Sequence, residues 1–135
     1  MHRAVDRGLA RREEEDISNL GMDEKSFRKG QDFISVLTDI DGKRVLDVGC
    51  GIGTYIRRFR QYTHDVHGIE VEPERVAEAS AELPNIVCAV GEALPYPDDH
   101  FDLVFSNEVI EHVEDDRRTA QEMVRVTKPG GLVVV

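Results

Sequence analysis

The sequence has few cysteines and no long apolar run, and these absences exclude several classes of protein. Only Cys50 and Cys88 occur among 135 residues, too few for the disulfide framework of a small secreted domain. No apolar stretch approaches the roughly 20 residues that a membrane-spanning helix needs. Residues 1–16 are charged and lack the apolar core of a secretory signal. We therefore expect a cytoplasmic protein without a membrane span.

Negative charge dominates and is unevenly distributed, with a formal net charge of −10. Residues 1–30 carry seven basic and seven acidic side chains, whereas residues 31–135 carry ten and twenty. So acidic a domain repels a phosphate backbone. The densest basic cluster, Arg57, Arg58 and Arg60, is more typical of a solvated helix face than of a nucleic-acid site. The charge therefore favours a small-molecule partner over a nucleic acid.

Residues 1–42 are predicted to form a charged arm and a cap helix, ahead of a core domain over residues 43–135. The arm, residues 1–22, has no sustained apolar period. The apolar positions that follow are Phe27, Phe33, Ile34 and Leu37. Their spacing predicts an amphipathic helix from Asp23 to about Asp41.

Short apolar runs alternate with helical patterns through the core domain. The predicted strands are 44–49, 65–71, 85–90, 101–107 and a fifth that begins at Leu132. The predicted helices are 53–62, 73–83 and one helix or a pair of helices over 108–127. This alternation indicates βαβ units and a doubly wound, mostly parallel α/β sheet with helices on both faces. Ligands bind such sheets beyond the carboxyl ends of the strands, so we expect the site there.

A glycine-rich turn from Asp47 to Gly53 joins the first predicted strand to the next helix. Without a Cβ the backbone turns tightly and admits a ligand, and the helix N-terminus beyond it suits a carboxylate or phosphate. The third glycine or alanine of a dinucleotide-binding G-x-G-x-x-G/A turn is replaced here by Thr54. A tight turn without a ligand is the alternative. Cys50 fits a small residue of the turn better than a reactive thiol, because the sequence places no base or cation beside it.

A carboxylate, Glu70, ends the second predicted strand, 21 positions after Gly49. A carboxylate at this point can accept hydrogen bonds from both hydroxyls of a ribose. Enzymes that bind dinucleotides place an acidic residue there too. Glu70 therefore predicts an adenosyl ligand without separating the two cofactor classes.

Three segments resemble motifs of the class I S-adenosylmethionine-dependent methyltransferases, in the order in which that family has them. They are LDVGCGIG (46–53), GEALPYPDDHFDLVFSNEVIEHV (91–113) and KPGGLVVV (128–135). The resemblance, to methyltransferase type 11-like domains, implies a Rossmann-like sheet of strand order 3-2-1-4-5 and S-adenosylmethionine as the cofactor. The family's sheet continues with a sixth and a seventh strand, so we expect this chain to be truncated before them.

The resemblance also implies which residues hold the cofactor. The glycine-rich turn is expected to hold the methionyl part, and Val71 to lean on the adenine. Many relatives carry an aspartate where Val90 stands, so backbone groups around Glu92 and Ala93 are expected to read the adenine amino group. The full set of expected cofactor-binding residues is Asp47, Gly49, Cys50, Gly51, Gly53, Glu70, Val71, Glu92, Ala93 and Asn107.

Polar residues follow the fourth predicted strand at helical spacing. Asn107 is expected to face the methyl donor, while Glu108, Glu111 and His112 would share one helix face. Such a face could bind a divalent cation, or His112 could act as a general base on a substrate hydroxyl. Three ligands are few for a metal, so we expect none and take Asn107, Glu108 and His112 as the catalytic candidates.

Together the motifs predict methyl transfer from S-adenosylmethionine to a small-molecule acceptor, through a carbon, oxygen or nitrogen atom. An NAD-dependent oxidoreductase and a non-catalytic domain that binds the adenosyl ligand are the alternatives. A chain that stops after its fifth strand would leave that apolar strand bare at the sheet edge, which invites aggregation. We therefore expect a fragment of a longer protein, or contact between copies through the exposed fifth strand.

Overall fold

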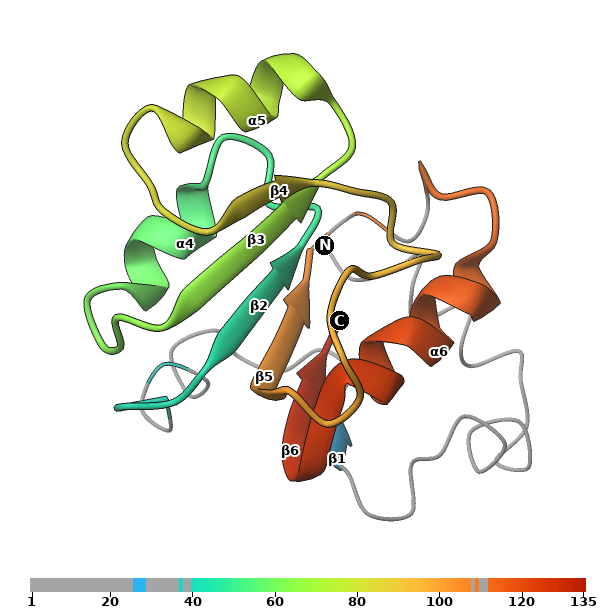
Figure 1. The fold of residues 1–135 in the computed structure, drawn as a ribbon. Helices are drawn as coiled ribbons and strands as arrows, with labels where there is room; N and C mark the ends of the chain where they lie inside the picture. The colour runs from blue at the N-terminus through green and yellow to red at the C-terminus, as the bar shows by residue number, and fades with distance from the viewer. Residues whose placement is uncertain (1–25, 29–36, 38–39, 108, 110–111) are drawn as a thin grey trace.

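A computed structural model of the chain describes residues 26–28, 37, 40–107, 109 and 112–135. Its centre is one parallel sheet in the order β1-β6-β5-β2-β3-β4 (Figure 1). The strands are β1 (Ser26–Arg28), β2 (Val45–Val48), β3 (Val66–Glu70), β4 (Ile86–Cys88), β5 (Phe101–Ser106) and β6 (Thr127–Val134). The helices are α4 (Thr54–Phe59), α5 (Pro73–Ser80) and α6 (Asp116–Val126).

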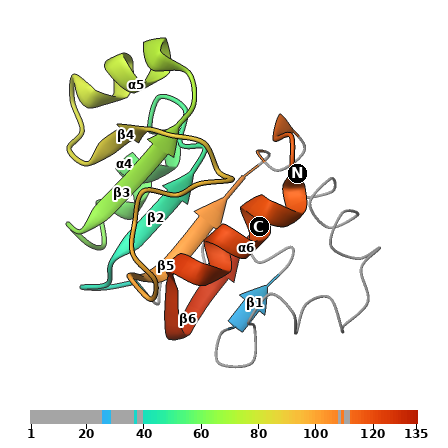
Figure 2. The ribbon, with the colours of Figure 1, turned by 45° about the vertical axis from the view of Figure 1, so that its right-hand side comes forward.

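The sheet is buried on both faces, as expected for a parallel sheet between helices. Side chains alternate along the central strands: Leu46 and Val104 join one apolar cluster, whereas Val45 and Leu103 join the other. The first cluster lies under α6, through Met123 and its neighbours. The second lies under α4 and also includes Leu37 and Ile40 from the predicted cap region. Figures 1 and 2 show α6 in front of the sheet and α4 behind it.

The predicted strand order is confirmed. The first to fifth predicted strands are β2, β3, β4, β5 and β6, and they lie side by side in the order 3-2-1-4-5 with every pairing parallel. Most boundaries fall close to the predicted ones, although β4 is three residues long where six were expected. The chain therefore has the doubly wound Rossmann-like architecture that its alternating pattern indicates.

Two predictions about the ends of the core are wrong. The helix expected from Asp23 does not extend over Ser26–Arg28, which forms strand β1 and pairs in parallel with β6 from Leu132 to Val134. Pairing satisfies the backbone groups of β6 that would otherwise be bare, and helical spacing of apolar residues could not reveal it. The fifth predicted strand, β6, is thus paired with β5 on one side and with β1 on the other. The exposed edge on which the expected contact between copies depended is therefore covered where β1 pairs.

The junction between α6 and β6 also differs from expectation. The helix begins at Asp116, with the Asp115 side chain accepting a capping hydrogen bond from the Arg118 amide at 2.9 Å. β6 then begins at Thr127 without a connecting loop, so Lys128 lies in the strand rather than in the last helical turn. Gly130 and Gly131 form an irregularity in the pairing with β5, where a Cβ on Gly131 would lie 2.8 Å from the Lys128 carbonyl oxygen. The two glycines therefore produce a bend within β6, rather than a connecting turn that precedes the strand.

Candidate functional site

The carboxyl ends of β2, β3 and β5 meet at one edge of the sheet, at the top in Figure 1. The turn after β2 is held to the end of β3, because the amides of Gly49 and Cys50 both donate to the Ile69 carbonyl, at 2.9 and 2.8 Å. Gly49 has a φ of +78°, and a Cβ there would overlap Val109. This position therefore requires glycine on both conformational and steric grounds.

Glu70 ties the glycine-rich turn to the start of α5. Its Oε2 accepts from the Gly51 amide at 2.9 Å, and its Oε1 accepts from the amides of Val71 at 2.9 Å and Glu72 at 3.0 Å. The side chain is buried, with 6% of the residue exposed. A carboxylate offers about four lone-pair positions, so these three bonds leave one of them, on Oε2, for another donor.

Two adjoining cavities open at this edge and share Gly49, Arg75 and Asn107. The smaller, of about 390 Å³, is further lined by Asp47, Cys50, Gly51, Ile52, Thr54 and Tyr55. The larger, of about 920 Å³, is further lined by Val48, Ile69, Glu70, Val71, Glu72, Ala89, Val90, Gly91, Glu92, Val109, His112, Val113 and Glu114. Of the expected cofactor-binding residues, all but Gly53 and Ala93 line one or both.

The two exceptions have other surroundings. Gly53, with a φ of +92°, is the N-cap of α4, and a Cβ on it would overlap Leu83. Ala93 is exposed and its amide donates to the Val90 carbonyl at 3.3 Å. Gly53 thus supports the conformation of the turn without lining a cavity. Ala93 lies on the solvent-exposed side of its loop.

Asp47 is a buried carboxyl, 2% exposed, whose Oδ2 has no hydrogen-bond partner among the described residues. Burial, and then the charge of Glu70, raises its pKa from 3.8 to about 8. The same causes, burial first and then the charges of Asp47 and Glu70, raise the pKa of the Cys50 thiol to about 12. Cys50 is therefore a protonated, inert thiol at neutral pH.

Replacing Asp47 with asparagine is expected to remove a pH dependence of stability. Between pH 3.8 and 8 the folded protein keeps a proton on Asp47 that the unfolded chain releases, so this group's contribution falls as pH rises. From pH 6 to pH 8 the loss is about 2 kcal/mol of unfolding free energy. Urea unfolding of both proteins at the two pH values measures it. Equal pH dependence in wild type and D47N would contradict the raised pKa.

Asn107 lies at the end of β5 and lines both cavities. Its Nδ2 donates to the hydroxyl of Tyr55 at 3.1 Å, whereas its buried Oδ1 has no partner among the described residues. The Tyr55 ring packs against Phe105 with the ring centroids 5.0 Å apart. The amide is thus oriented from α4, with an acceptor oxygen available to a ligand.

The three candidates after Asn107 are only partly described. Glu108 and Glu111 lie outside the described residues, so the predicted helix face and its metal alternative stay untested predictions. His112 is exposed and lines the larger cavity. The structure therefore brings Asn107 and His112 to one cavity without assembling the full candidate set.

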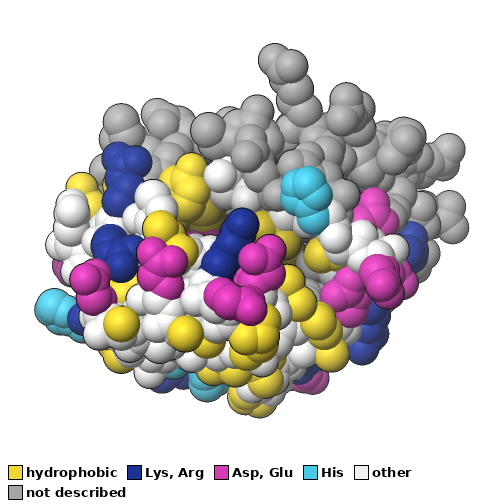
Figure 3. Space-filling view, turned by 90° about the horizontal axis from the view of Figure 1, so that it is seen from above, with side chains coloured by type: hydrophobic (Ala, Val, Ile, Leu, Met, Phe, Trp, Pro, Cys, Tyr) yellow, Lys and Arg dark blue, Asp and Glu magenta, His cyan; other side chains and the backbone are white. Residues whose placement is uncertain are grey.

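Sequence reasoning missed Tyr55 and Arg75. Arg75 lies in the first turn of α5, where its Nε is 3.2 Å from Glu72 Oε2. Both residues follow a site-forming strand end by a few positions, at the start of a helix, and that position is the signal that could have found them. Figure 3 looks onto this end of the molecule, where charges of both signs lie among hydrophobic side chains.

A sheet with this order, and a glycine-rich turn and a carboxylate at its ligand-binding edge, define a nucleotide-cofactor fold of the methyltransferase type. The family model described as a methyltransferase domain matches residues 46–135. The chain therefore belongs to this methyltransferase family.

Similar proteins match about 70% of the chain or more. Norajmaline N-methyltransferase of Rauvolfia serpentina is 40% identical over an alignment of 102 residues, and the match covers 69% of this chain and 35% of that protein. The 2-methyl-6-phytyl-1,4-hydroquinone methyltransferase of Synechocystis is 42% identical over 100 residues, covering 70% and 31%. A solved S-adenosylmethionine-dependent methyltransferase of Mesorhizobium loti matches with a TM-score of 0.66 and 28% identity, covering 78% and 53%. The chain thus spans about a third of the length of these curated relatives.

Proposed function

We propose that this chain binds S-adenosylmethionine across the two adjoining cavities, and that the protein to which it belongs transfers the methyl group to a small molecule. The observation that carries the proposal is Glu70, a buried carboxylate that lines the larger cavity, fixes the glycine-rich turn and keeps one lone pair for a further donor. One ribose hydroxyl can donate to that lone pair while all three backbone bonds are kept. A second hydroxyl would have to displace one of them.

The smaller cavity suits the methionyl part. A methionyl group carries an ammonium and a carboxylate, and this cavity offers partners for both. Asp47 Oδ2 and Asn107 Oδ1 are buried and have no partners among the described residues. A ligand ammonium beside Asp47 would offset the burial that keeps its proton, so that both oxygens can accept ammonium N–H groups. Arg75, which lines both cavities, supplies a cation for the carboxylate.

The larger cavity suits the adenine. Val71 and Val90 are 57% and 44% exposed, and both line this cavity, so a flat base can cover apolar surface that is otherwise in water. The Glu92 carboxylate accepts from the Asp115 amide at 3.3 Å. We therefore assign the adenine amino group to backbone near Gly91 and Glu92 rather than to the Glu92 side chain, and leave Ala93 outside the base contacts.

When bound, the cofactor would supply an electrophilic methyl group on a sulfonium, a leaving group that would keep the carbon–sulfur electron pair when an acceptor takes the methyl. Because that leaving group is already activated, the residues of the chain have mainly to position the reactants. Asn107 orients the donor end through its amide, and His112 is placed to accept a proton from an acidic acceptor group. Glu108 completes the candidate set. No metal is part of the proposal.

The acceptor class and the setting of the domain complete the proposal. The relatives' names include an alkaloid and a hydroquinone methyltransferase, and the acidic surface repels nucleic acid, so we propose a small-molecule acceptor. Among the described residues no helix has the length and hydropathy to span a membrane. We propose the cytoplasm as the compartment. We propose residues 43–135 as the cofactor-binding domain, to whose sheet the preceding residues 1–42 add β1 (Ser26–Arg28).

Calorimetric titration with S-adenosylhomocysteine tests the cofactor. We expect saturable binding of one ligand per chain, because the product shares the ribose, adenine and amino-acid groups to which the cavities are matched. NADH fluorescence is the parallel measurement, and we expect no enhancement, since Thr54 replaces the third small residue of a dinucleotide turn. A folded chain that binds NADH and not S-adenosylhomocysteine would reverse the assignment. Binding without transfer to any acceptor, in a protein that includes the remaining sequence, would favour the non-catalytic alternative.

A further inference from the structure

The segment after β4 has no regular secondary structure, although it forms a wall of the larger cavity. Residues 89–92 line that cavity, and the chain then runs over α6 to Asp98. Backbone groups outside helices and strands still need partners when they are buried. In this segment α6 supplies several of them, at Glu92, Leu94 and Tyr96.

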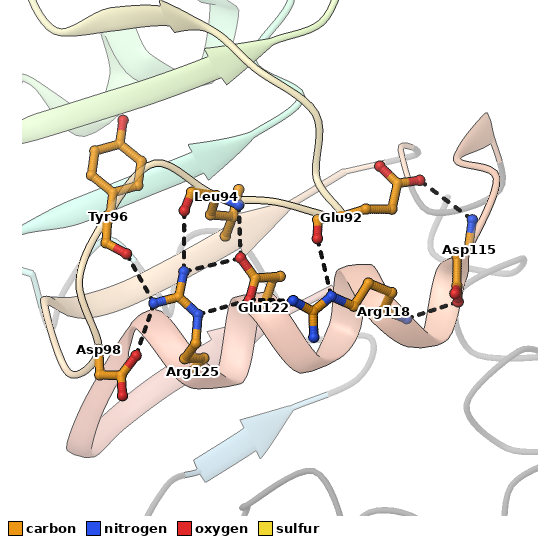
Figure 4. Close-up of polar contacts among 8 residues, drawn as sticks. All are labelled: Glu92, Leu94, Tyr96, Asp98, Asp115, Arg118, Glu122 and Arg125. Atoms are coloured by element: carbon orange, nitrogen blue, oxygen red, sulfur yellow. Dashed lines mark hydrogen bonds and ion pairs between the residues drawn. The ribbon is translucent and has the colours of Figure 1, made fainter.

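Two side chains of α6 hold the segment (Figure 4). Glu122 Oε2 accepts from the Leu94 amide at 2.7 Å, and the Arg125 guanidinium donates to the carbonyls of Leu94 at 3.1 Å and Tyr96 at 2.9 Å. Arg125 also contacts the Asp98 carboxylate at 2.8 Å. The planar guanidinium can satisfy several acceptors at once, which an ammonium cannot do in the same geometry.

Glu122 and Arg125 are also hydrogen-bonded to each other. Arg125 Nε donates to Glu122 Oε1 at 2.7 Å, and another guanidinium nitrogen donates to Oε2 at 2.9 Å. The Glu122 side chain is only 4% exposed. Burial would raise its pKa, but the hydrogen bonds from Arg125 and Leu94 outweigh burial and lower it. The carboxylate therefore stays ionised at neutral pH and keeps its hydrogen bond from the Leu94 amide.

A third α6 residue reaches the cavity wall itself. Arg118 Nε donates to the Glu92 carbonyl at 3.2 Å, and Glu92 lines the larger cavity. The contacts made by α6 thus fall on residues 92, 94, 96 and 98, immediately after the stretch that faces the proposed adenine. None of the three α6 side chains lines either cavity.

We propose that Glu122, Arg125 and Arg118 are positioning residues that hold the wall of the larger cavity in the conformation that receives the adenine base. The inference rests on the proposed function and deepens it. Without the clamp, the wall occupies this conformation only part of the time, and the apparent dissociation constant rises by the inverse of that fraction. The proposed ribose contact of Glu70 and the proposed methionyl contacts of Asp47, Asn107 and Arg75 are unaffected, because α6 touches none of these residues in the described contacts.

The test compares two ligands that differ in the base. S-adenosylhomocysteine carries the adenine, whereas S-ribosylhomocysteine keeps the ribose and the amino acid without it. For Arg125→Lys we expect about tenfold weaker binding of the first and unchanged binding of the second, both measured by competition-detected NMR. Arg118→Gln, on an exposed helix face, should fold normally and show the same selective loss to a smaller extent. Glu78→Gln, on the exposed side of α5, is the control and should match wild type.

The outcomes separate the clamp from the cofactor assignment. Equal weakening of both ligands in Arg125→Lys, or no weakening in both Arg125→Lys and Arg118→Gln, would overturn the clamp while wild-type binding leaves the cofactor proposal standing. If Arg125→Lys does not fold, the selectivity of Arg118→Gln decides. A folded wild type that binds neither ligand would overturn the cofactor assignment and the clamp with it.

Discussion

Replacing Glu70 with alanine is expected to weaken binding of S-adenosylhomocysteine on the order of a hundredfold. A hydrogen bond to a charged group contributes about 1.5–3 kcal/mol, and tenfold in affinity corresponds to about 1.4 kcal/mol. The substitution removes such a bond to the ribose. It also leaves the amides of Gly51, Val71 and Glu72 without their common acceptor, which loosens the turn that holds the amino-acid end.

The measurement is the calorimetric titration used for wild type, with circular dichroism to establish that the variant is folded. Glu74→Ala is the matched control, because Glu74 is an exposed carboxylate in the first turn of the adjacent α5 and lines neither cavity. We expect the control to bind as wild type does. Affinity of a folded Glu70→Ala variant within threefold of wild type would move the ribose away from this residue.

Replacing Gly68 with alanine is expected to give a large loss of stability through steric overlap alone, because this glycine has no left-handed backbone conformation to protect. Gly68 is buried in the middle of β3, and a Cβ there would overlap Ile56 Cδ1 and lie 2.8 Å from the Cys50 sulfur. Ile56 is fully buried in α4, so the helix or the glycine-rich turn has to shift. Overpacking of this kind costs about 1–3 kcal/mol, measured as a lower urea midpoint at unchanged slope.

A double-mutant cycle tests the cause of that loss. Ile56→Val removes Cδ1, the atom nearest to the added methyl group, so G68A should destabilise the Ile56→Val background less than it destabilises wild type. Strict additivity of the two changes would show that the contact is not responsible. The remaining cost in the double variant would report the approach to Cys50, and hence the coupling between this strand and the binding turn.

The parts of the fold that could be predicted are those that depend on local patterns of apolar residues and glycines in the sequence. Strand patterns such as Val45–Val48 and the glycine-rich turn after them indicate a parallel sheet and the edge at which a site is expected, because each strand's burial is visible in its own residues. The strand order followed from the resemblance to the family. The pairing of Ser26–Arg28 with β6 was not predictable, since three residues carry too little pattern to compete with a longer apolar period. This pairing depends on which strand of the assembled sheet has unpaired backbone groups at its edge, and the local sequence does not contain that information.

The same distinction holds for the site. Glu70 was found because it ends a strand, and its place beside the cavity follows from that position. The engagement of Glu92 with Asp115 and Arg118 was missed, because α6 approaches the segment from a distant part of the sequence. The Arg125 fork has a similar origin, since its acceptors lie about thirty residues away. Residues at strand ends can be assigned from sequence, but those that support a loop from another element cannot.

The Ile69 carbonyl accepts from both Gly49 and Cys50, and these bonds tie the glycine-rich turn to the central sheet. To open, the turn must break bonds to the last residues of β3, which pair with β2 on one side and β4 on the other. Its fluctuations therefore belong to the cooperative unit of the sheet rather than to the low-stability segments from which mobile lids are drawn. Any motion that controls ligand entry therefore has to come from other segments around the cavities, while the glycine-rich turn keeps its conformation.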